Sequence, residues 1–218
     1  MLDFPQTGSN LGSTATQRAW PACLGALVLG SIGLSMFVVP AIWPLSQLMM
    51  LAPAAIAATL VPRLRPLTGW TRGEVRLGLV LLVAVSSAAG LVAWTILAQP
   101  DLERAMAMVP EAPAAVLVLG AIGFAIVNAT LEELVFRGVL QSSLAEATGS
   151  MPVAIVLAAA AFGLAHLHGV PNGWLGAAMA GTWALVLGWV RVRTRGLVTP
   201  ILGHIVADLV IFALVSSG

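Results

Sequence analysis

The feature that most constrains the fold of this chain is a series of apolar stretches, each long enough to cross a lipid bilayer. A helix needs about 20 mainly apolar residues to span the hydrocarbon core. Such stretches cover residues 20–39, 41–61, 76–98, 113–143, 151–168, 173–190 and 197–216. In lipid, only helices and closed barrels satisfy all their backbone hydrogen bonds. The sequence therefore predicts an all-α, polytopic transmembrane helix bundle with about seven spans, in a range of about six to eight.

The composition also indicates a lipid environment. Of 218 residues, 59% are hydrophobic and only 9% are charged, whereas a soluble domain carries about 25% charged residues. A core of this size cannot absorb so much apolar surface, because a folded domain still exposes about a quarter of its unfolded surface or more. This excludes a soluble enzyme and a disordered protein. The net charge of +1 offers no footprint for nucleic acid, so we expect the bilayer as partner and no nucleic acid.

The arginines between the spans predict the orientation, because short arginine-rich loops stay in the cytoplasm. The second stretch is followed by Arg63, Arg65, Arg72 and Arg76, and the sixth by Arg191, Arg193 and Arg195. The segment after the third stretch instead carries Asp101, Glu103 and Glu111 with one arginine, Arg104. Seven spans with a cytoplasmic N-terminus and an external C-terminus fit all three segments. Because arginine is used without lysine, we interpret the chain as bacterial and expect it in the inner (cytoplasmic) membrane.

Two regions follow from this pattern. Residues 1–19 form a polar tail that we expect in the cytoplasm, and residues 20–218 form a single transmembrane domain. The tail lacks a basic segment leading into a short apolar stretch, so a cleaved signal peptide is not expected. The single cysteine, Cys23, excludes an internal disulfide framework.

Few ionisable residues remain at membrane depth. An ionisable group near the bilayer centre costs about 2.5–3.5 kcal/mol or more, so it is normally paired, buried in the bundle and functional. The residues are Glu132, Glu133, Arg137, His166, His204 and Asp208. They fall into three groups on three different spans. We therefore take them as candidates for one functional site.

The first group combines an ion pair with a second carboxylate. Glu133 and Arg137 are four residues apart and share a helix face. Glu132 points about 100° away. We interpret Arg137 as the group that neutralises and orients Glu133, which leaves Glu132 free to act as a base. A purely structural salt bridge explains the pair equally well, but it leaves Glu132 without a role.

The other two groups place histidines at the same spacing. Phe162 and His166 are four residues apart, and so are His204 and Asp208. Each pair therefore shares a helix face, and an aspartate next to a histidine fixes the imidazole tautomer. Each pair alone is also consistent with a hydrogen bond that hides polar atoms from lipid.

Together the three groups suffice for peptide hydrolysis. A water held by Glu132 and His166 attacks a carbonyl, and His204 donates a hydrogen bond to the developing oxyanion. In the alternative, Glu132, His166 and His204 bind Zn²⁺, because two histidines and a glutamate form a catalytic zinc set. The sequence leaves both mechanisms open.

The order EExxxR, FxxxH and HxxxN/D, each on its own hydrophobic helix, resembles the CPBP family of CAAX proteases and bacteriocin-processing enzymes, also called the Abi family. The match covers residues 113–216, and the residues are those of the three groups above. The resemblance implies an intramembrane endopeptidase of the glutamate or metal-dependent type. It assigns the attacking water to Glu132 and His166, and the oxyanion pocket to His204 and residue 208. The glutamate–water scheme requires no cofactor, with Zn²⁺ as the alternative.

Position 208 carries aspartate, whereas the other form of the third motif has asparagine there. An ionised Asp208 cannot donate a hydrogen bond to an oxyanion. We therefore expect Asp208 to orient His204, or to act in its protonated form.

The substrate expected from the resemblance is a protein or peptide that enters from the membrane. C-terminal sorting-signal processing of the myxosortase-like kind and bacteriocin or leader processing are the narrower hypotheses. Two other classes compete with a protease: a catalytically silent membrane scaffold or immunity factor, and a proton-coupled transporter that uses the same acids and histidines as a relay.

The predicted spans raise one conflict of depth. Glu132 lies about 28 Å along a helix from Pro113, and His166 lies about 22 Å from Met151. In spans of ordinary length, these positions fall near opposite faces of the bilayer. We therefore expect the overlong fourth stretch to bend around Gly138 or to end in the interface.

Overall fold

A computed structural model describes residues 15–38, 45–68 and 70–216, and within these ranges the chain forms helices joined by short segments. The α-helices are α1 (Ala15–Val38), α2 (Leu45–Leu60), α3 (Leu77–Ala98), α4 (Glu103–Met106), α5 (Ala114–Glu133), α6 (Gln141–Thr148), α7 (Met151–Ala165), α8 (Gly173–Thr194) and α9 (Val198–Ser216). A π-helix, η2 (Leu134–Leu140), joins α5 to α6, and the 3₁₀ helices are η1 (Pro62–Thr68) and η3 (His166–His168). The predicted all-α bundle is confirmed.

Six segments of the described chain are long and apolar enough to cross a membrane. They are Arg18–Ser35, Leu77–Ala98, Ala114–Thr148, Met151–His168, Gly173–Thr194 and Val198–Ser216. The stretch predicted at 41–61 forms the shorter helix α2, which has 16 residues and a length of about 24 Å. That is less than the hydrocarbon core of about 30 Å. Six spans and one shorter apolar helix agree with the predicted range.

The first helix begins earlier than predicted. α1 starts at Ala15, so residues 15–19 of the expected polar tail are helical. These residues include alanine, glutamine and arginine, which are good helix formers, and no glycine or proline. Residues 1–14 of the tail and residues 39–44 before α2 lie outside the described residues.

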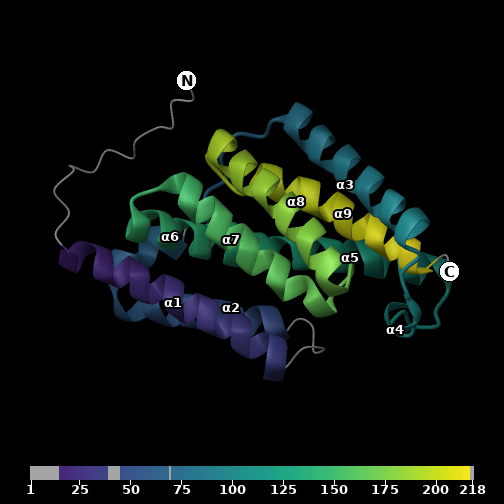
Figure 1. Cartoon of the computed structure of the whole chain (residues 1–218), viewed down its shortest axis with the longest axis horizontal. Coiled ribbons are helices and arrows are strands. Elements are labelled where there is room, and N and C mark those ends of the chain that lie inside the picture. Colours follow the sequence, from purple (N-terminus) through teal and green to yellow (C-terminus); the bar gives the residue numbers. More distant parts are fainter. Residues whose placement is uncertain (1–14, 39–44, 69, 217–218) are drawn as a thin grey trace.

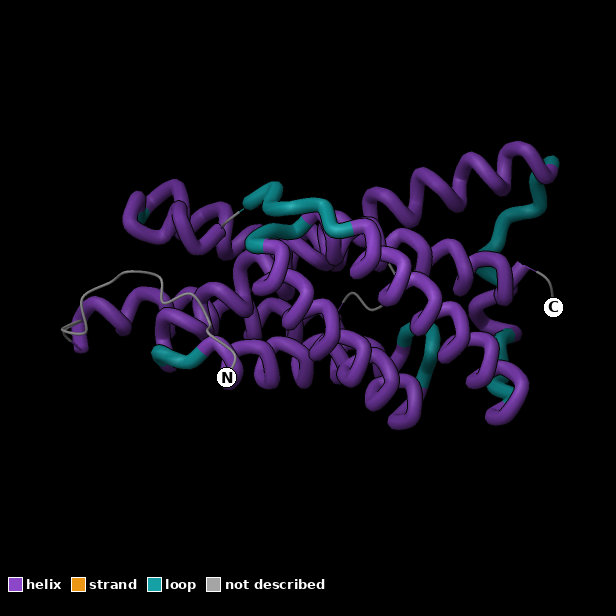
Figure 2. The backbone as a smooth tube through the Cα atoms, turned by 90° about the horizontal axis from the view of Figure 1, so that it is seen from above, coloured by secondary structure: helices purple, strands orange, loops and turns teal. Residues whose placement is uncertain are grey.

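The helices run side by side along the longest axis of the molecule (Figure 1, Figure 2). α9 packs against α3, α5 and α8, and α7 packs against α8 and α6. The hairpin of α1 and α2 runs along the other side of the bundle, where α1 also contacts α6 (Figure 1). α9, α5 and α7 carry the three predicted motifs, so the packing brings the motif helices into the interior.

Large apolar side chains also cover the outside of the bundle. On α3, Leu82 and Val85 are exposed, whereas Phe136 and Phe162 are buried in the core between η2, α7 and their neighbours. Water disfavours exposed apolar side chains at this density, and lipid tails do not. This distribution places the protein in a bilayer.

The fourth predicted stretch is part of a longer rod. α5, η2 and α6 are continuous over the 35 residues from Ala114 to Thr148, a length of about 52 Å that exceeds the hydrocarbon core. The predicted end at residue 143 is therefore wrong. The helix ends only where Gly149 adopts a left-handed conformation with φ +70°, the usual helix stop. At Gly138 the structure has a π-helix, a feature often found at functional sites.

The long rod also resolves the predicted conflict of depth. The chain turns at Gly149 and Ser150 and returns as α7. Measured from this turn, Glu132 lies about 25 Å back along the rod and His166 about 24 Å forward. The two side chains are therefore level. The conflict arose because the rod extends beyond the length assumed for one span. The stretch was expected to bend around Gly138 or to end in the interface, and the structure has instead a continuous rod with a π-helix at Gly138.

Small residues let α7 and α8 approach closely. A Cβ atom on Gly163 of α7 would lie 2.5 Å from the backbone oxygen of Ala177 on α8. Ala158, Ala159 and Ala161 on α7 are also buried. These small residues allow the two helices to pack closely beside Phe162.

The two arginine-rich segments lie together at one end of the bundle. The amide of Glu74 donates to the oxygen of Thr194 at 2.7 Å, and the amide of Leu197 donates to the oxygen of Thr71 at 2.8 Å. Gly73 has φ +66°, and a Cβ atom there would collide with the backbone at Thr194. Both segments thus lie on the same side of the membrane, as the arginine pattern requires.

Candidate active site

The predicted pair of Glu133 and Arg137 forms where α5 passes into the π-helix. Arg137 Nη1 donates to Glu133 Oε1 at 2.9 Å, and the side chains are 2% and 0% exposed, respectively. Arg137 Cζ also lies 4.5 Å from the centre of the Phe162 ring, within the range of a cation–π contact. The predicted orientation of Glu133 by Arg137 is confirmed as geometry.

His204 on α9 hydrogen-bonds to the same glutamate. Its Nδ1 lies 2.8 Å from Glu133 Oε1. Because an ionised carboxylate only accepts, Nδ1 carries the proton and donates it. The other nitrogen, Nε2, then faces two further carboxylates: Glu132 Oε2 and Asp208 Oδ1, each 3.6 Å away. Glu133 therefore sets the orientation of His204, and the role expected for Asp208 passes to a residue on another helix.

Glu132 differs from Glu133 in two ways: its side chain is partly exposed, and it accepts no hydrogen bond from the described residues, whereas Oε1 of Glu133 accepts two. The Glu132 side chain is 14% exposed. Its Oε2 atom is buried and accepts no hydrogen bond from the part of the chain that the structure describes. A buried acceptor without a donor carries a free-energy cost, so it calls for an explanation such as a bound water or a catalytic role. The division between a fixed Glu133 and an available Glu132 agrees with the sequence interpretation.

His166 lies at the end of α7, next to the Phe162 ring. Its Nδ1 lies 2.9 Å from the backbone oxygen of Phe162, so Nδ1 donates and Nε2 keeps a lone pair in the neutral ring. The Phe162 ring centre lies 4.3 Å from the His166 ring centre and 6.1 Å from that of His204. The charges of Glu132 and Arg137 act on His166. The structure thus brings all three predicted groups together.

Asp208 is held by Asn128, which is itself held by Gln47, and neither residue was among those predicted from the sequence. Asn128 Nδ2 donates to Asp208 Oδ2 at 3.2 Å, and Gln47 Nε2 donates to Asn128 Oδ1 at 3.2 Å. This chain of amides joins α2, α5 and α9. Asn128 stands four residues before Glu132 on the same helix face, and that spacing was a usable signal. For Gln47 the sequence offers no comparable signal.

Trp183 on α8 is the other residue missed from sequence. Its ring centre lies 4.8 Å from that of His204 at an interplanar angle of 86°. The indole Nε1 is buried and has no hydrogen-bond acceptor among the described residues. The sequence contains seven tryptophans, and nothing in its spacing singles out Trp183. It adds an aromatic wall and an available donor beside His204.

The chemistry of the donor set suits zinc, since Glu132 and the Nε2 atoms of His166 and His204 are the expected ligand types. In the described ranges, however, no three His, Cys, Asp or Glu side chains are arranged to hold one metal ion. Instead, His204 hydrogen-bonds to the Glu133 carboxylate, and His166 hydrogen-bonds to the backbone oxygen of Phe162.

Residues 114–210 match the family described as type II CAAX prenyl endopeptidase, Rce1-like. This range runs from the start of α5 into α9 and contains all six predicted site residues. The resemblance to the CAAX proteases is therefore confirmed over this part of the chain. No curated protein and no solved structure matches the chain.

Proposed function

Because residues 114–210 match the Rce1-like family, we propose that this chain is an intramembrane endopeptidase that cleaves a membrane-associated protein or peptide with a water activated by Glu132 and His166. The observation that carries the proposal is the difference between two adjacent glutamates. Glu133 is fully buried and accepts two hydrogen bonds at Oε1, which leaves only its Oε2 without a donor, whereas the partly exposed Glu132 accepts no hydrogen bond from the described residues.

In the first step, the water oxygen bonds to the carbonyl carbon of the scissile peptide. His166 Nε2 accepts a hydrogen bond from this water and orients it, while Glu132 takes a proton from it. The carbonyl π electrons move onto oxygen and give a tetrahedral oxyanion. Glu132 then passes the proton to the leaving nitrogen as the C–N bond breaks. The oxyanion re-forms the carbonyl, and the products are a carboxylic acid and an amine. A proton then passes from the acid to the amine, which gives a carboxylate and an ammonium group.

His204 serves the oxyanion. Its Nδ1 proton is committed to Glu133, so only Nε2 is left to face the substrate. The imidazolium form donates from Nε2, and the neighbouring carboxylates of Glu132 and Asp208, each 3.6 Å away, favour that charged form. Trp183 Nε1 is a second donor next to this ring.

Asp208 replaces the donor amide of the family pattern with an acceptor. Asn128 supplies an amide directly to Asp208. We propose that Asn128 holds this carboxylate at the edge of His204, so that its charge supports the imidazolium. Asp208 then acts through His204 and not as a donor to the substrate.

Zinc remains the competing mechanism. Glu132, His166 and His204 would be its ligands, and a bound zinc would supply a nucleophilic hydroxide and polarise the carbonyl. Metal analysis of the purified active protein separates the schemes. The glutamate–water mechanism predicts full activity at less than about 0.1 zinc per chain, and loss of activity on metal removal with recovery on zinc addition would contradict it.

The substrate class is tested with two probes. The family name points to a substrate with a prenylated C-terminus, and the bacterial membrane expected from the sequence offers proteins with hydrophobic C-terminal tails. The purified protein in proteoliposomes is given either a prenylated cysteine peptide with three following residues or a membrane protein with such a tail, in water enriched in ¹⁸O. We expect one ¹⁸O atom in the new carboxylate of a cleaved product.

Matched variants discriminate between the competing functions. Glu132→Gln should abolish cleavage, whereas Glu146→Gln, at an exposed position of α6, should not. A scaffold or immunity factor would keep its cellular phenotype in Glu132→Gln. A transporter would show proton-coupled uptake in the same vesicles without product. Either result would contradict the proposed peptidase.

A further inference from the structure

Arg191 is a half-buried cation that the proposed mechanism leaves unused. It lies in the last turn of α8, and its Nη2 donates to Ser142 Oγ on α6 at 2.7 Å. Its Nε is buried and donates to no acceptor among the described residues. The guanidinium is thus bonded on one side and left with an unused donor on another.

No described carboxylate neutralises this cation at ion-pair distance. The ion pairs of the described residues involve Arg76, Arg137 and His204, and none includes Arg191. The charge of Glu133 does act on Arg191, but neither of its oxygens bonds to Arg191: Oε1 accepts from Arg137 and His204, and Oε2 has no hydrogen-bond partner among the described residues. A partly desolvated charge without a counterion is costly, and proteins normally pair it. The arrangement therefore lacks an anion.

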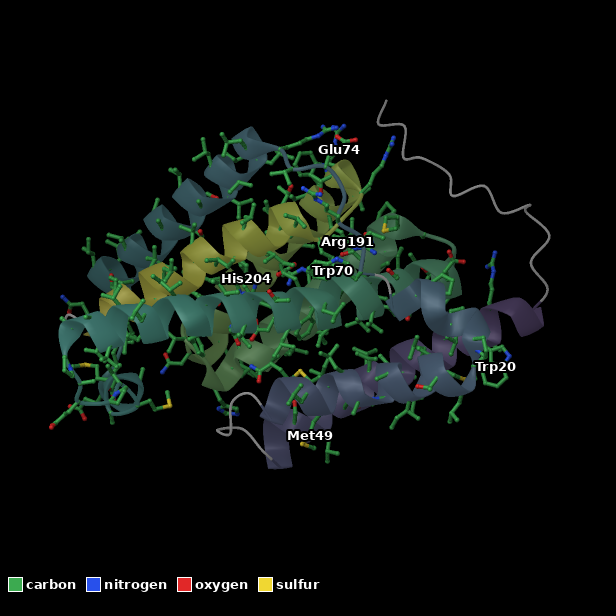
Figure 3. The ribbon with its side chains drawn as sticks, turned by 180° about the vertical axis from the view of Figure 1, so that it is seen from behind. Trp20, Met49, Trp70, Glu74, Arg191 and His204 are labelled. Carbon is green, nitrogen blue, oxygen red and sulfur yellow. The ribbon has the colours of Figure 1, made fainter. Side chains whose placement is uncertain are left out.

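Arg191 contacts the α6 part of the rod, whereas the proposed active site lies where α5 passes into η2. Gln141 Nε2 donates to the oxygen of Gly188 at 3.3 Å, which fixes this turn of α8 against the rod. Ser142 follows Glu132 by ten residues, or about 15 Å along the rod. Arg191 and His204 are both labelled in Figure 3, along the line where α9 and the rod lie side by side in this view. An extended peptide covers this distance with about four residues.

We propose that Arg191 and Ser142 bind the free C-terminal carboxylate of the substrate, a few residues beyond the scissile bond. The guanidinium is the side chain best suited to a carboxylate, because its fork of N–H groups matches two oxygens. The proposal rests on the endopeptidase function and refines it by naming the two residues that recognise the carboxylate, so a substrate without a free carboxylate at this distance loses the contact.

The neighbouring arginines do not share this environment. Arg193 is exposed and its Cζ lies 5.2 Å from the Trp189 ring centre, and Arg195 is exposed as well. These are ordinary positions for arginines at a membrane surface. Arg191 alone of the three combines a buried unused donor with a bond to the rod. Arg193 therefore provides the matched control.

The test measures binding separately from cleavage. Full-length Glu132→Gln protein in nanodiscs is titrated with a fluorescent prenylated cysteine peptide that carries three further residues, either as the free acid or as the C-terminal amide. We expect the acid to bind at least tenfold more tightly than the amide. Adding Arg191→Gln should remove this difference, and adding Arg193→Gln should leave it in place.

Three outcomes would overturn the proposal. The first is equal binding of the acid and the amide, including no binding of either. The second is an equal loss of binding for both peptides in Arg191→Gln, which indicates a structural role, and the third is loss of a co-purified anionic lipid in Arg191→Gln with unchanged peptide binding, which indicates a headgroup site. Cleavage by protein with Glu132 intact is measured in parallel. Binding of the acid without cleavage would contradict the peptidase while supporting the carboxylate site.

Discussion

The two adjacent glutamates should respond in opposite ways to removal, and this difference is the sharpest consequence of the structure. Glu133→Ala removes the acceptor of two hydrogen bonds and leaves Arg137, whose side chain is 2% exposed, as a buried charge without its counterion. Glu132→Ala removes a side chain whose Oε2 has no hydrogen-bond donor among the described residues. The first change should therefore damage the fold and the second the chemistry.

The expected magnitudes follow from burial. Removing one partner of a buried ion pair costs about 3–5 kcal/mol, because the remaining charge is desolvated and unpaired. Glu133→Ala should fall in this range. Glu132→Ala should cost less than about 1 kcal/mol, since the net value of one ordinary hydrogen bond is about that large. Replacing both partners, Glu133→Leu with Arg137→Met, should recover much of the loss, because apolar residues of similar volume often replace a buried pair at little cost.

Unfolding of the purified protein in bicelles, measured by steric trapping, gives these free energies directly. Cleavage activity of the same samples shows whether the double variant is folded but inactive, as the loss of the His204 anchor requires. The reasoning would be refuted if Glu133→Ala cost less than about 1 kcal/mol, or if the double variant were no more stable than the single one.

Three further predictions concern single contacts. Gly163→Ala should destabilise the protein by about 1–3 kcal/mol, because the added Cβ meets the backbone of α8. Gly123→Ala is the control: its Cβ has open space, so this change should be neutral or slightly stabilising in the same unfolding assay. Exchanging Asn128→Asp with Asp208→Asn should retain more activity than Asp208→Asn alone, since the hydrogen bond at 3.2 Å can re-form with reversed polarity; equal activities would show that the bond is unimportant. Trp183→Phe keeps an aromatic ring beside His204 but removes the donor, so kcat should fall about tenfold or more with unchanged folding, and an unchanged kcat would remove Trp183 from the oxyanion site.

The helical spans and the members of the site were predictable because both depend on local rules. Apolar length identifies a membrane helix, and a spacing of four places Glu133 and Arg137 on one face whatever surrounds them. The confirmed ion pair is a direct consequence of that spacing. That His166 and His204 lie close to this ion pair was predictable too, because ionisable groups are costly in lipid and are normally buried together in the bundle.

The remaining features depend on how helices meet, which spacing within one helix does not encode. The bond from His204 to Glu133 joins α9 to α5, and it replaces the expected intrahelical orientation by Asp208. Asn128 was overlooked because an amide carries no charge to mark it as costly at membrane depth. The continuation of the rod to Thr148 was missed because α6 is polar, so the apolar pattern stops before the helix does.

The central claim is that Glu132 and His166 act on one and the same water. A double-mutant cycle tests it most directly: kcat is measured for Glu132→Gln, His166→Ala and the double variant on one cleavable probe. If both side chains hold the same water, either change disables the step, and the double variant should be no slower than the slower single variant by more than about threefold. Losses that multiply in the double variant would contradict the account, because they would mean that the two residues act independently.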